Sequence, residues 1–357
     1  MKHKSVIYLI ILIVVLLSAY LVYHNRNSFA GETVSSVYSV EAQTSIFAAK
    51  SRGDLLVQNR EGITALNKNG SQKYMIIKQL TEPVMQNVGK YTLMYDRDGF
   101  ELLVFKGGSS AFEFRSDNLI KLAKINSSGY VAIVSDDSGF KQKVQILNAK
   151  GEVIYIWQLG DSYITDIDIT ADGKTIIAAT VLTDGEVATS RIVLIDINNE
   201  SIIDETEREN SLFMSVKCVK NSHVFVVGES EMLVFDRYGE KKWGLEYDER
   251  ILQRFLIAPN GNPVLAFIGT RNNTDIEIYN NIGKRTGTYT SDAEIKAIDS
   301  ESGVIAICER HDILLLSYNG QIKARKTIQK DAREIVLLSK QDVAVVGSSA
   351  IEIIKIR

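Results

Sequence analysis

The chain has 357 residues, of which 24 are glycine, 3 proline and 2 cysteine, and 45% are apolar. So little proline beside so many apolar side chains excludes a disordered or collagen-like chain, and two cysteines exclude a disulfide-rich secreted scaffold. The chain has 41 basic and 44 acidic residues, and its net charge of −3 argues against a nucleic-acid partner.

An apolar segment near the N-terminus predicts a membrane anchor. From Val6 to Tyr23 the sequence contains no Asp, Glu, Lys or Arg, and about 20 helical residues cross the hydrocarbon of a bilayer. Lys2 and Lys4 precede this segment, so the positive-inside rule leaves the N-terminus in the cytoplasm and exports the rest. The predicted organisation is a cytoplasmic N-terminus at 1–5, a single-pass signal anchor at 6–23, a linker at 24–33 and an extracytoplasmic domain at 34–357.

A cleaved signal peptide ending at Ser28-Phe29-Ala30 is the alternative, because small residues stand at the right spacing there. The apolar core is longer than such signals use, and the polar run His24–Asn27 lengthens the distance to the cleavage point. We favour the retained anchor and leave cleavage open.

From residue 34 onward, short runs of Val, Ile, Leu, Tyr and Phe alternate with polar residues and end at Gly, Asn or Asp, which predicts an all-β domain. The runs recur in groups of four about every forty residues, a period typical of β-propellers. Three clear units span 162–209, 210–249 and 293–331. The predicted turns between first and second strands are at Gly53, Gly89, Gly129, Gly173, Ser222, Gly261, Gly303 and Asp342. Those between third and fourth strands are at Gly70, Gly107, Gly151, Asn199, Gly239, Gly283 and Gly320.

The last unit ends at Arg357 after only three strands. We predict that Val34–Glu41 supplies its missing outer strand, because this exchange closes the ring and removes two exposed sheet edges. The count is then eight blades in one domain, or seven if the weak first unit is not a blade.

Two segments carry a family resemblance. Leu233–Trp243, LVFDRYGEKKW, resembles the outer-strand motif of quinoprotein-type (PQQ-like) propeller repeats, in which an aliphatic strand, an Asp, a turn Gly and a docking Trp recur. The segment QILNAKGEVIYIW, ending at Trp157, is a looser match, and Asp172-Gly173 resembles a hairpin turn of WD40-like repeats. The layout as a whole resembles an uncharacterised Firmicutes family of membrane-anchored propellers, a domain of unknown function. This resemblance implies the fold and membrane attachment and no chemistry.

The motifs that suggest chemistry are better explained by the fold. The run from Asp166 through Asp168 to Gly173 imitates a calcium loop, but Ala179 stands where that loop needs a bidentate Glu. Cys218 and Cys308 fall on predicted strands, where thiols usually act as small apolar residues. The four histidines lie too far apart for a zinc site: His3, His24, His223 and His311. We therefore predict no catalytic, cofactor-binding or metal-binding residues.

The predicted loops separate by charge. The loops between second and third strands and the connectors between blades are mainly acidic, and they are the longer ones, as binding loops usually are. The partner-binding residues predicted there are Asp136, Asp137, Asp184, Glu186, Arg271 and Asn272. The tight hairpins are mainly basic, and we predict a patch facing the anionic membrane at Lys241, Lys242, Lys284 and Arg285.

Two functions remain open at this stage. The first is a non-enzymatic scaffold that binds a protein or cell-envelope partner through the acidic face. The second uses the axial channel, either as a glycan hydrolase or lyase or as a sensor of a small ligand. Carboxylates and histidine lining the channel would favour the enzyme, and an apolar or plugged channel would favour the scaffold.

Overall fold

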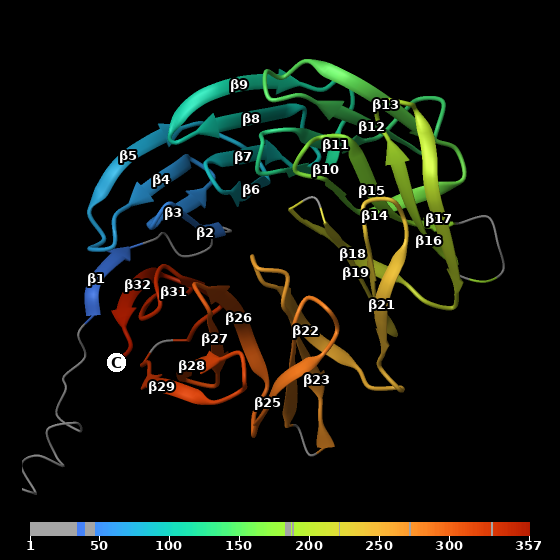
Figure 1. Cartoon of the computed structure of the whole chain (residues 1–357). Coiled ribbons are helices and arrows are strands. Elements are labelled where there is room, and N and C mark those ends of the chain that lie inside the picture. Colours follow the sequence, from blue (N-terminus) through green and yellow to red (C-terminus); the bar gives the residue numbers. More distant parts are fainter. Residues whose placement is uncertain are drawn as a thin grey trace, which may run out of the picture.

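The computed structural model describes residues 34–39, 47–182, 187, 189–220, 222–270, 273–329 and 331–357. These residues form eight four-stranded antiparallel sheets arranged around a central axis (Figure 1). The eight-bladed propeller is therefore confirmed over the seven-bladed alternative. No helix in the described part of the chain is long and apolar enough to cross a bilayer, and the predicted anchor, Val6–Tyr23, lies outside that part.

In each blade the strands run in chain order from the innermost to the outermost, except that β1 is the outermost strand of blade 8. Blades 1 to 4 consist of β2 (Phe47–Ser51), β3 (Asp54–Asn59), β4 (Gly62–Leu66) and β5 (Gln72–Ile77); β6 (Pro83–Val88), β7 (Tyr91–Asp96), β8 (Glu101–Lys106) and β9 (Ser109–Arg115); β10 (Ile120–Ile125), β11 (Val131–Ser135), β12 (Gln142–Leu147) and β13 (Val153–Leu159); β14 (Ser162–Ile169), β15 (Thr175–Leu182), β16 (Thr189–Asp196) and β17 (Ser201–Glu209). Blades 5 to 8 consist of β18 (Phe213–Val219), β19 (His223–Gly228), β20 (Glu231–Phe235) and β21 (Lys241–Glu246); β22 (Leu252–Ile257), β23 (Pro263–Ile268), β24 (Thr274–Tyr279) and β25 (Arg285–Ser291); β26 (Ile295–Glu301), β27 (Val304–Glu309), β28 (Asp312–Ser317) and β29 (Ile322–Thr327); β30 (Glu334–Leu337), β31 (Asp342–Val346), β32 (Ala350–Lys355) and β1 (Val34–Ser39).

The ring has two faces. The hairpin face carries the turns that join first to second and third to fourth strands, and the connector face carries the remaining loops and the connections between blades. The predicted turn residues all lie at or beside the hairpin-face turns, and those that are glycine have positive φ, a conformation that glycine adopts without strain.

The exchanged strand is confirmed. β1 pairs antiparallel with β32, with Val37 opposite Glu352 and Ser39 opposite Ala350. Val34 lies opposite Ile354, near the end of β32, so β1 starts on the hairpin face. Residues 40 and 41 of the predicted strand lie outside the described residues.

The core consists of eight apolar clusters, one at each junction between consecutive blades. Blades 6 and 7 share a cluster that includes Ile276 and Ile305, and blades 8 and 1 share one that includes Ile353 and Leu55. Successive strand residues point to opposite faces of a sheet, and here both faces are covered by neighbouring blades. The middle strands are therefore continuously apolar, as in β31, and each blade depends on its neighbours for burial.

The outer strands hold adjacent blades together at their hairpin ends. The Trp243 indole in β21 donates a hydrogen bond from Nε1 to the carbonyl oxygen of Asn281 in the next blade, at 3.1 Å. Gly283 has φ +83°, and a methyl group there would come within 2.8 Å of the indole. This contact is the docking tryptophan that the PQQ-like resemblance implies. Other aromatic rings lie against glycines of the following blade in the same way, at Tyr74 and Phe112.

In the looser PQQ-like match, in blade 3, a tyrosine and not the tryptophan has the docking position. Tyr155, opposite Ile146, occupies the position that Trp243 has opposite Val234, directly after the bulge in each hairpin. Trp157 lies two residues farther along β13. The docking position of blade 3 therefore belongs to a tyrosine.

Candidate functional site

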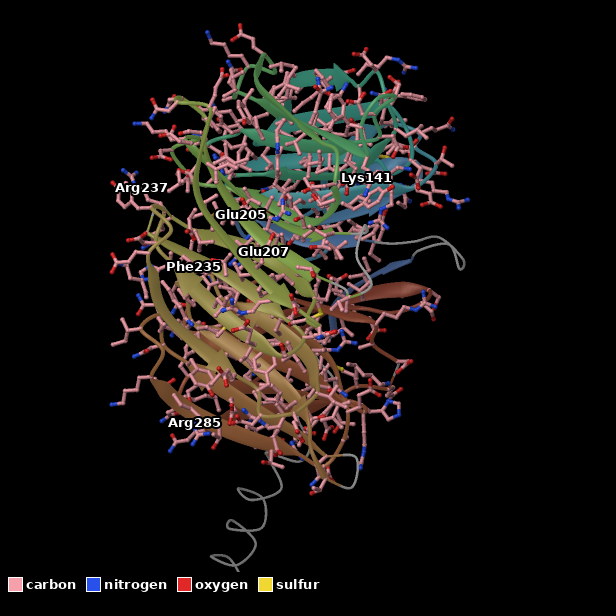
Figure 2. All side chains as sticks on the ribbon, turned by 90° about the vertical axis from the view of Figure 1, so that its right-hand side faces the viewer. Lys141, Glu205, Glu207, Phe235, Arg237 and Arg285 are labelled. Carbon is pink, nitrogen blue, oxygen red and sulfur yellow. The ribbon has the colours of Figure 1, made fainter. Side chains whose placement is uncertain are left out.

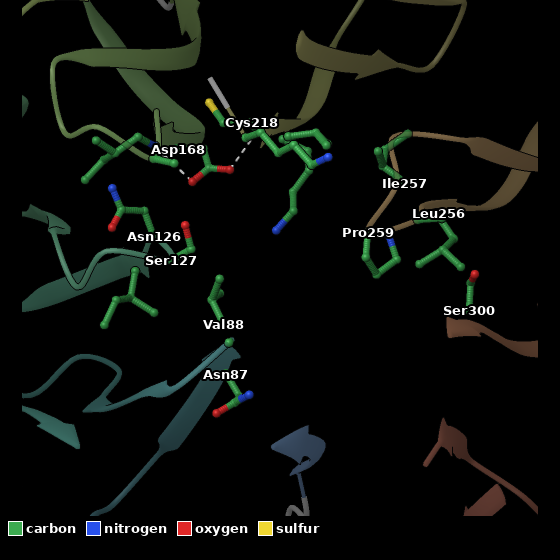
Figure 3. A pocket seen from close by; sticks show the side chains of 18 of the residues that line it. Asn87, Val88, Asn126, Ser127, Asp168, Cys218, Leu256, Ile257, Pro259 and Ser300 are labelled. Carbon is green, nitrogen blue, oxygen red and sulfur yellow. Dashed lines mark hydrogen bonds between the residues drawn. The ribbon is translucent and has the colours of Figure 1, made fainter. Parts of the chain in front are cut away.

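A cavity of about 540 Å³ lies where the inner strands reach the hairpin face (Figure 3). Residues from β6, β10, β14, β18, β22 and β26, or from the turns that follow them, form its wall. The charged lining residues are Asp168, Lys217, Lys220 and Asp299, and the wall also includes Val88, Ser127 and Pro259. No histidine is among the lining residues that the structure describes. The mixed lining matches neither the carboxylate–histidine cluster expected of an enzyme nor a plugged channel.

Both carboxylates of the cavity bind backbone N–H groups. Asp168 accepts hydrogen bonds from the Cys218 nitrogen at 2.8 Å and from the Ile169 nitrogen at 2.9 Å. Asp299 accepts from the nitrogens of Leu337, at 2.6 Å, and Ser300, at 2.7 Å. Burial is the largest influence on both carboxyl groups and raises the pKa of each. Their oxygens are thus already engaged in joining inner strands.

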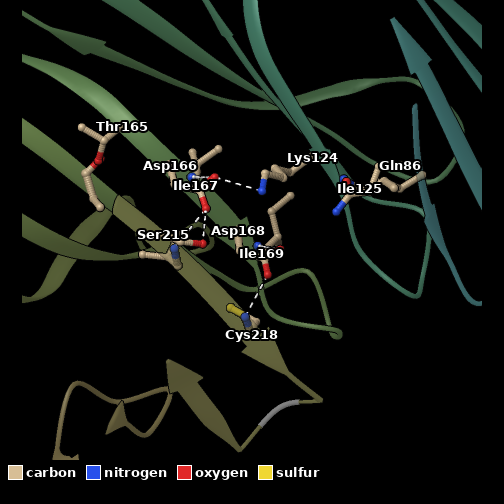
Figure 4. A network of polar contacts seen from close by, with 12 residues as sticks. Gln86, Lys124, Ile125, Thr165, Asp166, Ile167, Asp168, Ile169, Ser215 and Cys218 are labelled. Carbon is tan, nitrogen blue, oxygen red and sulfur yellow. Dashed lines mark hydrogen bonds and ion pairs between the residues drawn. The ribbon is translucent and has the colours of Figure 1, made fainter. Parts of the chain in front are cut away.

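Asp166, two residues earlier in β14, also joins this strand to β18 (Figure 4). Its carboxylate accepts from the Val216 nitrogen at 3.0 Å and the Ser215 hydroxyl at 2.9 Å, and it pairs with Lys124 at 3.0 Å. Asp172 instead pairs with Arg237, at 2.9 Å, in a hairpin turn. Asp166 and Asp168 therefore lie in a strand and Asp172 lies in the hairpin turn after it, in keeping with the strand-and-hairpin interpretation of this sequence.

Side chains link inner strands at other junctions as well. Gln86 in β6 accepts from the Ile125 nitrogen of β10 at 2.8 Å. Gln253 in β22 accepts weakly from the Ile295 nitrogen of β26, at 3.4 Å. Sequence reasoning missed these links, although their signal is visible as Asp and Gln standing at alternate positions of otherwise apolar inner strands.

Glu334 in β30 completes the series at the ring closure, since it accepts a hydrogen bond from the backbone of Ala48 in β2. Burial, followed by the nearby charge of Asp299, raises the pKa of Glu334 to about 7. This carboxyl group therefore changes charge near neutral pH.

Both cysteines lie on strands, as expected, and neither forms a disulfide. Burial raises the pKa of the Cys218 thiol well above its ordinary value and that of Cys308 to about 11. Because the thiolate is the reactive form, both thiols are poor nucleophiles.

Two of the six predicted partner-binding residues lie in the described part of the chain. Asp136 pairs with Lys121 at 3.1 Å, and Asp137 accepts from the Gln158 amide at 2.8 Å, which lowers the pKa of Asp137. Both belong to the loop between β11 and β12 on the connector face. The other four lie outside the described residues: Asp184, Glu186, Arg271 and Asn272.

The structure brings the predicted basic residues to two adjacent hairpins but pairs half of them with acids. Lys242 contacts Asp236 at 3.0 Å and Glu240 at 2.7 Å, and Arg285 contacts Glu277 at 2.8 Å.

Lys241 and Lys284 have no ion pair with any described residue. Two exposed apolar side chains lie in the same hairpins, Tyr238 with 66% and Ile282 with 70% of its surface accessible. Figure 2 shows the ring from the side, with Arg237 and Arg285 along one edge. This part of the hairpin face is therefore both basic and partly apolar.

Several solved structures share the architecture. BamB from Moraxella catarrhalis is 13% identical, with a TM-score of 0.54 over 90% of this chain and 98% of that one. The computationally designed Ika8 protein is 14% identical, with a TM-score of 0.65 over 89% and 98%. Hsv2 from Kluyveromyces lactis is 9% identical, with a TM-score of 0.54 over 80% and 100%. Identities this low establish a common fold and nothing more.

No curated protein matches the sequence. Residues 24–356, which include every blade, match the family of unknown function DUF5711, and the chain belongs to that family.

Proposed function

We propose that the protein is a non-enzymatic interaction scaffold of a bacterial cell envelope, of the kind its layout resembles in Firmicutes. Val6–Tyr23 anchors the chain with its N-terminus in the cytoplasm, and the propeller lies outside the cytoplasm. Its connector face binds a protein or cell-envelope partner. The observation that carries the scaffold role is that the carboxylates of the axial cavity are occupied by backbone N–H groups.

This occupancy weighs against a glycan hydrolase in the channel. Such an enzyme needs one carboxyl group to give a proton to the leaving oxygen and a second to activate water or attack the sugar. Asp168 and Asp299 each hold two N–H groups. Moving either carboxylate toward a substrate would leave those buried donors without a partner, at a cost of about 1–3 kcal/mol each.

The starting point of β1 supports the orientation. Val34 lies on the hairpin face, and the residues between it and the predicted anchor, Asn25–Thr33, can extend at most about 30 Å. The hairpin face would then approach the membrane, with the connector face directed away from it.

The chemistry of the hairpins supports the same orientation. Lys241 and Lys284 offer charges that no described acid neutralises, and Tyr238 and Ile282 offer exposed apolar surface beside them. Charges act over about 8 Å at physiological salt, so this patch contributes only when it touches anionic lipid.

The experiment introduces a photoreactive benzoylphenylalanine at one position of the full chain in its own cells. At Asp137, on the connector face, we expect reproducible crosslinks to one protein or wall polymer. At Lys284, on the hairpin face, we expect crosslinks to lipid. Ile77, exposed on the outer strand of blade 1, is the matched control and should give neither.

Lipid adducts at Asp137, or no reproducible adduct there, would contradict the scaffold and its orientation.

A small-ligand sensor remains the second candidate, because the cavity has a volume within the roughly 300–1,000 Å³ usual for small-molecule sites.

A further inference from the structure

The axial cavity is asymmetric because the inner strands are unequally spaced. β18 and β22 contact each other less than any other neighbouring pair of inner strands (Figure 1). β22 is also the only one of the described inner strands in which no residue is buried. The cavity therefore extends to a wall of partly exposed apolar side chains, Leu256 and Ile257, followed by Pro259 (Figure 3).

The adjacent wall, formed by β18 and the turn that follows it, carries positive charge. Lys217, in β18, and Lys220, in the turn that follows it, both line the cavity. Neither forms a direct ion pair or a side-chain hydrogen bond with any described residue, although the Lys217 charge acts on Asp168 and opposes the effect of burial on its pKa. Positive charge in a partly enclosed cavity attracts anions more strongly than the same charge on open surface, because less solvent screens it.

The acids of the cavity offset this positive charge only in part. The Asp168 and Asp299 carboxylates each accept two backbone N–H groups, which offset their negative charge at short range. The Lys217 charge interacts with that of Asp168, whereas Lys220 has no acidic partner among the described residues. The backbone N–H groups therefore compensate both acids, while Asp168 compensates Lys217 only in part and no described acid compensates Lys220.

We propose that this cavity binds a small organic anion with an apolar body, whose acidic group contacts Lys217 and Lys220 and whose body packs on Leu256, Ile257 and Pro259. The acidic group is a carboxylate or phosphate, carried by a free metabolite or by a lipid headgroup. This site does not require the membrane anchor or the partner on the connector face.

The test uses the full chain in zwitterionic nanodiscs and three benzophenone photoprobes that share one apolar body: benzoylbenzoate, the corresponding benzyl alcohol and the corresponding benzylamine. Crosslinked residues are identified by mass spectrometry. We expect benzoylbenzoate to label the segment from Leu256 to Pro259 about tenfold more than the alcohol does, the difference expected when a favourable charge interaction is lost. The amine should label this segment least.

Lys217→Gln with Lys220→Gln should remove the preference for the carboxylate probe and leave labelling by the alcohol unchanged. Lys241→Gln with Lys284→Gln, outside the cavity, is the matched control and should leave the preference intact. Unchanged labelling by the alcohol also shows that the cavity variant has kept its fold.

Unlabelled phenylbutyrate stands for a free carboxylate and dihexanoyl phosphatidylglycerol for a lipid headgroup. The compound that lowers labelling by benzoylbenzoate identifies the source of the acidic group. Equal labelling by all three probes, labelling outside the cavity only, or competition by neither compound would overturn the proposal. Loss of the Asp137 crosslinks described above would refute the scaffold without affecting this outcome.

Discussion

The two junctions that flank blade 5 differ, although one repeat builds both. Between blades 4 and 5, Asp166, Asp168 and Thr165 of β14 reach the backbone of β18. Between blades 5 and 6, no side-chain hydrogen bond joins β18 to β22 in the described part of the chain. Large rings fill that junction instead, with Tyr247 edge-on to Phe267 at 5.2 Å between centroids.

The difference shows how a propeller adjusts its central cavity without altering the repeat. Short polar side chains on an inner strand draw the next inner strand close, because a buried backbone N–H group needs an acceptor. Aromatic side chains occupy more volume between blades, so the inner strands separate and the cavity widens at that junction. Four predictions, ordered by expected effect, test this explanation.

The largest effect should come from Phe267→Ala at the aromatic junction. Phe267 is buried beneath the guanidinium of Arg250, whose Cζ lies 4.1 Å from the ring centroid. Removing a buried phenylalanine side chain costs about 4 kcal/mol of unfolding free energy. Urea unfolding monitored by fluorescence measures it, with the exposed Phe140→Ala as control, expected within about 0.5 kcal/mol of the unmodified chain. A loss below about 1.5 kcal/mol would mean that aromatic packing does not maintain this junction.

Asp166→Ala should cost about 3 kcal/mol at the polar junction, because it leaves the Val216 nitrogen without its acceptor and Lys124 without its partner. The same urea titration measures it. Asp166→Asn keeps an acceptor oxygen and should recover part of the loss. If Asp166→Ala and Asp137→Ala, on an exposed loop, unfold at the same urea concentration, the inner-strand links do not stabilise the ring.

The ring-closing junction should make stability depend on pH. Burial and the charge of Asp299 raise the pKa of Glu334 from an ordinary 4.5 to about 7. Between these values the folded chain keeps a proton that the unfolded chain releases. Stability from this group is therefore complete below about pH 4.5 and is lost as the pH rises to about 7, by up to about 3 kcal/mol.

Glu334→Gln should flatten this dependence, as measured by urea midpoints across the same pH range. An identical pH dependence in the variant and the unmodified chain would remove Glu334 as its source.

The smallest effect should come from Tyr247→Phe. The buried Tyr247 hydroxyl has no hydrogen-bond partner among the described residues, so its removal should stabilise the chain by up to about 1 kcal/mol. Tyr279→Phe is the matched control, because it removes a hydroxyl that donates to Glu277 at 2.6 Å and should destabilise the chain. Thermal unfolding of the two variants compares them, and a lower melting temperature for Tyr247→Phe would contradict the prediction.

The sequence predicted the features that depend on residues close together in the chain. Turn glycines such as Gly173 and Gly283 mark the hairpins because few other residues adopt positive φ, and the incomplete last unit predicted the exchanged strand. The partners of Asp166 could not be predicted, since the Val216 nitrogen is 50 residues away on another blade. The width of the cavity depends on the combined volume of side chains from two neighbouring blades. These residues are far apart in the sequence, so no local sequence pattern predicts that volume.

The strand exchange also has a consequence for the order of folding. β1 is synthesised before every other described strand, but its partner β32 is the last of them. β1 therefore stays unpaired until β32 has been made, and closing the ring costs the entropy of joining two strands that lie far apart in the sequence. Blade 8 is complete only when both β1 and β32 are present, so a product that terminates before β32 keeps an open sheet edge available for proteolysis or aggregation.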